Sequence, residues 1–320
     1  MTNILDVQAL KTEFRRKNTL IRAVNNISFT IKKGSVLSIV GESGSGKSVT
    51  MHSVLRLIPS TGKIVAEKIN FMGRDLMRLT EKEMRKIRGD QISMIFQDPM
   101  SSLNPTIKIG RQISEVLLWH HKANPKEAKE RTIRMLHEVG IASPIERYNQ
   151  YPFEFSGGMR QRVMIAMALI GEPRLLIADE PTTSLDVTVQ AQILALIKKM
   201  QEQNKMSVVL ITHNLAVATM MADEMIVMYA GQIVEQATKA EFLNRASHPY
   251  TVALLGSTPK LNMKERLQSI PGQPPDLKNI NLEGCPFVDR CSAKMERCSR
   301  EEPPAVQLSP THRIRCWLYT

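Results

Sequence analysis

A phosphate-binding loop is the clearest chemical signal in the sequence. Residues 41–48 read GESGSGKS and match the pattern G-x-x-x-x-G-K-[ST]. A buried-strand pattern at 36–40 precedes the loop and a helical pattern at 48–57 follows it, as such loops require. Backbone N–H groups and the positive end of the helix would face the phosphates, and glycines would allow close approach. The alternative is a Gly/Ser-rich turn with a capping serine, which this context disfavours.

The residue types assign roles within the loop. We expect Lys47 to reach the β- and γ-phosphates and the Ser48 hydroxyl to bind Mg²⁺. Phe14, shortly upstream, could stack on adenine, although packing within a hairpin explains an aromatic there equally well. The predicted nucleotide-binding residues are therefore Phe14, Gly41, Glu42, Ser43, Gly44, Ser45, Gly46, Lys47 and Ser48.

Further along the chain, polar residues follow apolar strand patterns. The run 175–178 ends in Asp179 and Glu180, the Walker B arrangement, so we expect Asp179 to orient Mg²⁺ and Glu180 to act as general base. A helix-capping aspartate beside an exposed glutamate is the alternative. Gln97 could contact Mg²⁺ or the attacking water, and His213 the γ-phosphate. Each would be an ordinary loop residue by itself, but the carboxyl ends of strands in a doubly wound sheet converge on one crevice.

The elements that must position these residues alternate between strands and helices, which predicts a mostly parallel sheet covered on both faces. Strands are expected at 3–10 and 24–31 around a polar, hairpin-like excursion at 11–22, and again at 64–72. A capping-box pattern at Thr80 starts a helix over 79–88. The block 106–171 reads as a helical subdomain. The prolines beyond residue 258 predict an irregular tail after a linker at 269–275.

Composition limits the partners and the compartment. The chain of 320 residues has 43 Lys+Arg against 31 Asp+Glu, a net charge of +12 that suits nucleic acid, an anionic membrane surface or a nucleotide. Aromatic residues make up 5% of the chain and do not alternate with basic runs, so we expect no nucleic-acid partner. No apolar run approaches the roughly 20 residues of a spanning helix, and the N-terminus does not resemble a signal peptide. These features predict a cytosolic protein.

All four cysteines lie in the last 36 residues: Cys285, Cys291, Cys298 and Cys316. In a reducing compartment, such a confined group favours a metal over disulfides. The spacing C-x₅-C-x₆-C lacks the C-x₂-C pairs that are usual in structural zinc sites, which makes zinc less favoured without excluding it.

The stretch 155–162 reads FSGGMRQR, just before a predicted helix and the Walker B strand. Ser156, Gly157 and Gly158 at a helix N-terminus would form a second anion site. With these residues the chain resembles the ATPase subunits of ABC transporters over residues 3–236. The resemblance rests on the phosphate loop, the Gln97 loop, this signature, Walker B, the turn at 184–186 and His213, in the family's order. Phe155 and Met159 depart from the usual LSGGQ signature but leave the serine hydroxyl and the backbone donors.

The resemblance implies a P-loop NTPase core with an antiparallel β subdomain and an inserted helical subdomain. The implied domains are an ATPase domain at 1–237, a helical connector at 238–270 and a small irregular cysteine extension at 271–320. In the family, two subunits pair head to tail, so that the signature of one completes the ATP site on the phosphate loop of the other. Asp186 belongs to a turn at that dimer interface.

The stretches 97–105, 151–169 and 248–251, with the tail GCPFVDRC-x₆-C-x₁₇-C, look like the dipeptide/oligopeptide importer subgroup. In that subgroup such a tail binds a 4Fe–4S cluster, so the resemblance makes Cys285, Cys291, Cys298 and Cys316 candidate ligands. Four soft ligands are compatible with that role. Zinc and free thiols remain the alternatives.

We therefore expect an ATPase that uses ATP and Mg²⁺ to power peptide uptake from the cytoplasmic face of the membrane. The implied partners are two transmembrane permease subunits, an extracytoplasmic solute-binding protein, and a second ATPase subunit that is a related chain or another copy. Import of nickel or another small solute is the nearest alternative. A non-transport ABC ATPase acting on ribosomes or DNA is less favoured, because such chains usually carry two ATPase halves or a coiled-coil insertion.

Overall fold

The structure is a computed structural model that describes residues 2–16, 19–98, 102–182, 185–257, 270–278, 280 and 283–320. Residues 99–101 and Ser184, which belong to two motifs quoted above, lie outside the described residues, as does part of the linker. The contacts divide the chain into two compact units, which are described separately. The first contains residues 78–210 with short pieces at 1–4 and 32–34, and the second contains residues 5–31, 35–77 and 211–320.

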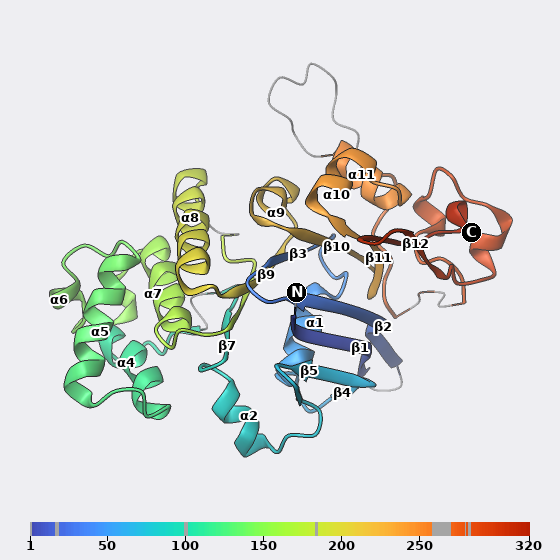
Figure 1. The fold of residues 1–320 in the computed structure, drawn as a ribbon. Coiled ribbons are helices and arrows are strands. Elements are labelled where there is room, and N and C mark those ends of the chain that lie inside the picture. Colours follow the sequence, from blue (N-terminus) through green and yellow to red (C-terminus); the bar gives the residue numbers. More distant parts are fainter. Residues whose placement is uncertain are drawn as a thin grey trace. The chain divides into compact units, whose positions relative to one another are not determined.

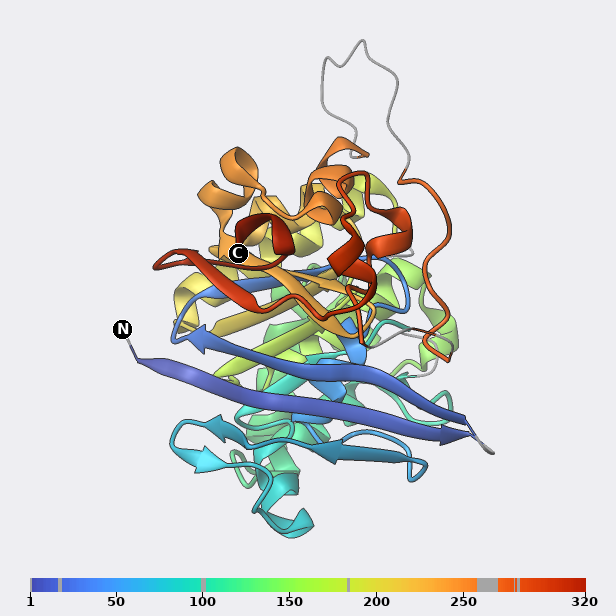
Figure 2. The same ribbon diagram turned by 90° about the vertical axis from the view of Figure 1, so that its right-hand side faces the viewer.

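The second unit contains an antiparallel sheet with the order β2-β1-β5-β6, in which β4 also pairs with β1. Figure 2 shows its two long strands side by side. The predicted strands at 3–10 and 24–31 are longer than expected, because most residues of the hairpin-like stretch at 11–22 belong to these two strands, which are neighbours in the sheet. The predicted strand at 64–72 is two strands. The bounds are β1 (Asn3–Arg16), β2 (Thr19–Lys32), β4 (Gly62–Val65), β5 (Lys68–Phe71) and β6 (Arg74–Asp75).

A second sheet of the same unit has the order β12-β13-β11-β10-β3. β3 runs parallel to β10, and all five of its residues are buried, as expected for a strand covered on both faces. The tail is less irregular than its prolines suggested: β12 and β13 form a hairpin, and Ile314 of β13 pairs with Glu235 of β11. The bounds are β3 (Val36–Val40), β10 (Glu224–Tyr229), β11 (Gln232–Thr238), β12 (Ala305–Ser309) and β13 (His312–Arg315).

Four helices and three short 3₁₀ turns complete the described part of this unit. Thr238 caps α10 with a capping box, and His248 caps α11, whose first residue is Pro249. The core beneath them contains the large buried rings Tyr229, Tyr250 and Phe287. The bounds are α1 (Lys47–Val54), α9 (Leu215–Met221), α10 (Lys239–Arg245), α11 (Pro249–Gly256), η2 (Val288–Arg290), η3 (Glu296–Ser299) and η4 (Trp317–Tyr319).

The first unit contains the parallel strands β7 (Ile92–Ile95) and β8 (Leu175–Asp179) and the first four residues of β9 (Ser207–Thr212). Its helical block is confirmed, and Figure 1 shows α4, α5, α6 and α7 grouped together. The capping box at Thr80 is formed. The helices are α2 (Glu81–Ile87), α4 (Ile109–Trp119), α5 (Pro125–Glu138), α6 (Pro144–Arg147), α7 (Gly157–Leu169) and α8 (Val187–Asn204), with a 3₁₀ turn η1 (Pro152–Glu154).

Among the helices of the described residues, none combines the length and the apolar composition needed to cross a membrane.

Candidate functional site

The phosphate loop joins β3 to α1 within the second unit, and its glycines are required by close backbone contacts. Gly41 has φ 152° and Gly46 has φ 96°. A Cβ on Gly41 would lie 2.2 Å from the carbonyl oxygen of Met228, and one on Gly46 would lie 2.3 Å from that of Ala23. Both distances are far below van der Waals contact. The backbone of the loop is therefore packed against its supporting strands in a shape that only glycine allows.

Lys47 lies along this loop. Its Nζ donates hydrogen bonds to the carbonyl oxygens of Gly41, at 2.8 Å, and Glu42, at 2.9 Å. No side chain caps α1, which starts at Lys47, and the buried Ser45 hydroxyl has no hydrogen-bond partner among the described residues. An uncapped helix N-terminus, a buried lysine and an unpaired hydroxyl fit the phosphates of a nucleotide.

A cavity of about 250 Å³ opens beside the loop in the same unit. Residues 274–277 of the tail form its far wall. The lining residues are Glu42, Ser43, Gly44, Ser45, Tyr229, Ala230, Pro274, Pro275, Asp276 and Leu277. The outer side of the phosphate loop therefore faces the tail across this cavity.

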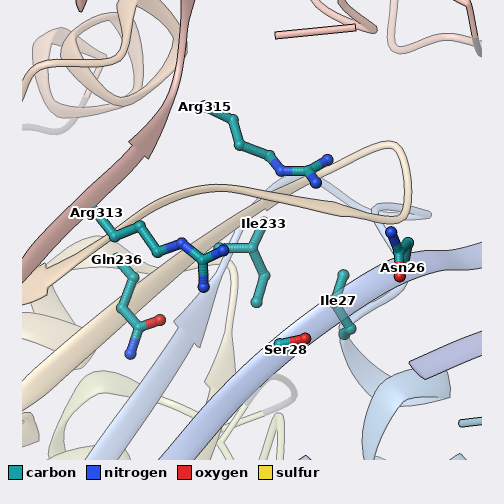
Figure 3. Close-up of a pocket in the computed structure, with 7 residues that line it drawn as sticks. All are labelled: Asn26, Ile27, Ser28, Ile233, Gln236, Arg313 and Arg315. Atoms are coloured by element: carbon teal, nitrogen blue, oxygen red, sulfur yellow. The ribbon is translucent and has the colours of Figure 1, made fainter. Parts of the chain in front are cut away.

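A second, smaller pocket of about 30 Å³ lies between β2, β11 and β13 (Figure 3). Arg313 and Arg315 reach toward it, and Asn26, Ile27, Ser28, Ile233 and Gln236 complete its lining. None of these residues belongs to the phosphate loop. The volume holds about one water molecule, so the pocket is not a nucleotide site.

The carboxylates and Gln97 lie together in the first unit. Ile95 pairs with Ala178 across the parallel strands β7 and β8, so both strands end side by side. The Gln97 amide donates a hydrogen bond of 3.1 Å to the Glu180 carboxylate, and Asp179 is 2% exposed. Glu180 has φ 46°, a strained left-handed conformation for a non-glycine residue. The prediction that these strand ends converge is confirmed for Gln97 and Glu180.

The signature residues stand at the start of α7 in the same unit. Ser156 caps the helix, and its hydroxyl accepts a hydrogen bond of 3.4 Å from the Met159 N–H. Apart from its chain neighbours and the backbone of its own helix, no described residue has a heavy atom within 4 Å of the place where a Cβ on Gly157 would be. The helix start is therefore open at Gly157.

The remaining predicted residues are placed as follows. Asp186 caps α8 by accepting a hydrogen bond of 2.9 Å from the Val189 N–H. His213 is exposed directly after β9. Phe14 lies opposite Gly62 in the pairing of β1 with β4, and a Cβ on Gly62 would come within 2.8 Å of its ring. Gly62 thus makes room for this ring, which is compatible with the alternative that Phe14 packs within the hairpin.

The four cysteines of the tail lie near one another without forming a ready-made metal site. Among the described residues, no group of three or more His, Cys, Asp or Glu side chains could hold a metal ion. The thiols are close enough to influence one another. Burial raises the pKa of the Cys285 thiol to about 12, and the charges of Cys298, Cys316 and Cys291 act in the same direction. The Cys285 N–H also donates to the Cys298 carbonyl at 2.7 Å.

Comparison with known proteins gives two family matches. The ABC transporter family matches residues 24–183, and the C-terminal region of oligopeptide/dipeptide transporters matches residues 234–298. The chain is 49% identical to the dipeptide transport ATP-binding protein DppD of Bacillus subtilis, over 99% of this chain and 95% of that protein. It belongs to the ATP-binding subunits of ABC transporters. The Escherichia coli dipeptide transport protein DppD is 46% identical over 98% of this chain and 96% of its own length.

Solved structures of ABC cassettes confirm the predicted α/β fold class. The dimeric cassette MJ0796 bound to ADP and Pi has a TM-score of 0.66 and 27% identity, covering 73% of this chain and 98% of its own. The cassette cbiO1 from Clostridium perfringens has a TM-score of 0.63 and 26% identity, covering 77% of this chain and 92% of its own. ATP is the nucleotide of this ABC subunit, and ATP hydrolysis in transport is its activity.

Sequence reasoning missed two residues that contact this ABC subunit's site. Gln161, one turn into α7, donates a buried hydrogen bond of 2.6 Å to the carbonyl oxygen of Pro181, directly after Glu180. Arg290, in the tail, pairs with Glu42 of the phosphate loop. Gln161 stood within the signature stretch and could have been singled out there. Arg290 is 248 residues from its partner, and no local pattern points to it.

Proposed function

We propose that this chain is the ATP-hydrolysing subunit of an importer of dipeptides or oligopeptides. The observation that carries the proposal is the presence of a formed phosphate loop and the C-terminal region of oligopeptide/dipeptide transporters in one chain. The DppD relatives, named as dipeptide transport ATP-binding proteins, cover nearly the whole chain. Both observations favour a peptide over nickel as the imported solute.

In this proposal, the phosphate loop from Gly41 to Ser48 binds the ATP phosphates. Ser48, Gln97 and Asp179 are the residues that would hold Mg²⁺, which would supply charge stabilisation to the phosphates. Glu180 takes a proton from the attacking water, and His213 contacts the γ-phosphate. The hydrogen bond from Gln97 to the Glu180 carboxylate supports this assignment, because it orients the base.

The open helix start at Gly157 supports a role for the signature residues in assembly. We propose that Ser156, Gly157 and Gly158 bind the ATP held by a second ATPase subunit, with Asp186 at the shared interface. The dimeric MJ0796 cassette supports such pairing. The helical region 106–171 would dock on two permease subunits at the cytoplasmic face of the membrane, supplied by a solute-binding protein. Trp119, Ile145 and Phe153 support a docking role, because these apolar side chains are mostly exposed.

Peptide uptake tests the proposed function directly. A strain that lacks this chain and requires one amino acid is expected not to grow when that amino acid is supplied only within a dipeptide or oligopeptide. The wild-type gene should restore growth, while a Lys47→Ala gene should not, because it lacks the buried cation of the phosphate loop. Growth under nickel limitation should be unaffected. Normal peptide use together with defective nickel uptake would instead support the nickel alternative.

We also propose that Cys285, Cys291, Cys298 and Cys316 hold a 4Fe–4S cluster that staples the tail. Two observations support this cluster. All four cysteines are confined to the tail, and a backbone hydrogen bond joins Cys285 to Cys298. Metal binding would complete the site, since thiolate ligands often gather only around the metal itself.

Metal analysis of the full chain, purified without oxygen, tests the cluster. We expect about four iron atoms per chain and a broad visible absorbance. Cys298→Ser should lose both, while Ser299→Ala, a neighbouring change without a thiol, should keep them. If the protein contains zinc but no iron, the cysteines form a zinc site and not a cluster. If it contains neither metal, the four cysteines are free thiols.

A further inference from the structure

The C-terminal extension (residues 271–320) contacts the phosphate loop through one ion pair. Arg290 in the extension faces Glu42 in the loop, with Nη1 2.6 Å from Oε2 and Nη2 2.9 Å from Oε1. Two parallel hydrogen bonds between a guanidinium and a carboxylate form the strongest geometry available to such a pair. The extension is therefore attached to the second residue of the loop.

Arg290 is fixed on its own side of this contact. Its side chain is 5% exposed, its Nε donates to the Pro271 carbonyl oxygen at 2.8 Å, and Nη1 also reaches the Tyr229 hydroxyl at 3.2 Å. The guanidinium lies over the rings of Tyr229 and Phe287, at 5.7 and 6.0 Å. With so many contacts, it presents its charge at a defined place rather than sampling solvent.

Glu42 is fixed on the loop side as well. Its backbone N–H donates to the Tyr250 hydroxyl at 2.9 Å, and its carbonyl oxygen accepts from Lys47 Nζ. Tyr250 packs edge-on against Tyr229, with the ring centroids 4.7 Å apart. The residue that pairs with Arg290 is thus also one of the two whose carbonyl oxygens hold Lys47 in place.

The charge of Glu42 needs a partner at this position. An unpaired carboxylate beside a loop built for phosphates would repel them, and three-quarters of this side chain is withdrawn from solvent that could screen it. Arg290 neutralises the carboxylate and directs it toward the extension.

We propose that Arg290 is a positioning residue of the ATP site, through which the C-terminal extension sets the shape and charge of the phosphate loop. This inference rests on the proposed ATP-binding role of the loop. The inference gives the C-terminal extension a second role, because the folded extension helps the phosphate loop to bind ATP.

The test compares Arg290→Ala with the double variant Glu42→Gln/Arg290→Ala, using the full chain for binding of a fluorescent ATP analogue and the assembled transporter for turnover. We expect Arg290→Ala to raise the Kd and the KM for ATP about tenfold and to change kcat less than about twofold. In the double variant, the Kd and the KM for ATP should return to within about threefold of the wild-type values, because the unpaired carboxylate is gone. Arg300→Ala is the matched control, since Arg300 is exposed and pairs with Glu296.

Two results would overturn the proposal. One is an unchanged ATP affinity in Arg290→Ala. The other is a folded Arg290→Ala protein whose weakened ATP affinity is not restored when Glu42→Gln is added. In that case Arg290 would have only a structural role. If Arg290→Ala does not fold, Arg290→Lys replaces it, with an expected KM increase of about threefold, and no increase would equally overturn the proposal. Failure of the wild-type chain to bind ATP would instead overturn the proposed function.

Discussion

Replacing Glu180 with glutamine is expected to stop ATP hydrolysis while leaving ATP binding intact. The substitution keeps the size of the side chain but removes the oxygen that takes the proton from water. General-base catalysis contributes about 10²- to 10⁴-fold to such reactions, so we expect a loss of at least about 100-fold in kcat. Phosphate release by the assembled transporter measures the loss, and titration with a fluorescent ATP analogue measures binding.

Glu172→Gln is the matched control for this change. Glu172 is also a non-glycine residue with a left-handed backbone, at φ 54°, and it lies in the same unit with an exposed ion pair to Arg131. We expect its kcat to stay within about twofold of wild type, since exposed ion pairs contribute little. Unchanged hydrolysis in Glu180→Gln would remove Glu180 as the base. Loss of ATP binding in that variant would mean that the substitution distorted the site.

Replacing Gly46 with alanine is expected to abolish ATP binding. The new Cβ would lie 2.3 Å from the Ala23 carbonyl oxygen, a backbone atom that cannot turn aside, and alanine disfavours φ 96°. The start of α1 must then move, and with it Lys47. We expect the Kd for ATP to rise at least about 100-fold, equivalent to about 2.7 kcal/mol. Calorimetric titration of the purified chain with ATP measures this change.

Gly44→Ala separates the steric clash from the backbone strain. Gly44 has φ 78°, but no described atom lies within 4 Å of its would-be Cβ. We expect about a tenfold rise in Kd, from strain of roughly 1–2 kcal/mol. Equal losses in the two variants would show that strain, and not the contact with Ala23, controls the loop. Normal binding in Gly46→Ala would contradict the geometry of the loop.

Local signals in the sequence were sufficient for several elements. The capping box at Thr80 lies where it was expected, because helix starts depend on neighbouring residues. The strand at 36–40 was predicted with its bounds, since a continuous apolar run between breakers reads clearly.

Partners that are distant in the sequence decided the elements that were predicted wrongly. The polar residues from 11 to 15 look unlike a strand, yet residues 11–14 pair with residues 62–65 and the Arg15 N–H donates to the Thr61 carbonyl oxygen. The tail seemed too rich in proline for regular structure, but the short segment between Pro304 and Pro310 forms β12, which pairs with β13. Pairing of this kind depends on tertiary contacts, which cannot be predicted from the β-strand propensity of one segment.

By itself, the sequence determined the chemistry: a glycine-rich loop with Lys47 for phosphates, Asp179 and Glu180 after an apolar strand, and cysteines confined to the tail. Each is a pattern of neighbouring residues, so spacing along the chain is enough to recognise it. Only the tertiary structure brought Gln97 to Glu180 and Arg290 to Glu42, across 83 and 248 residues. Strand pairing and ring packing made those contacts, and neither is encoded within a single stretch.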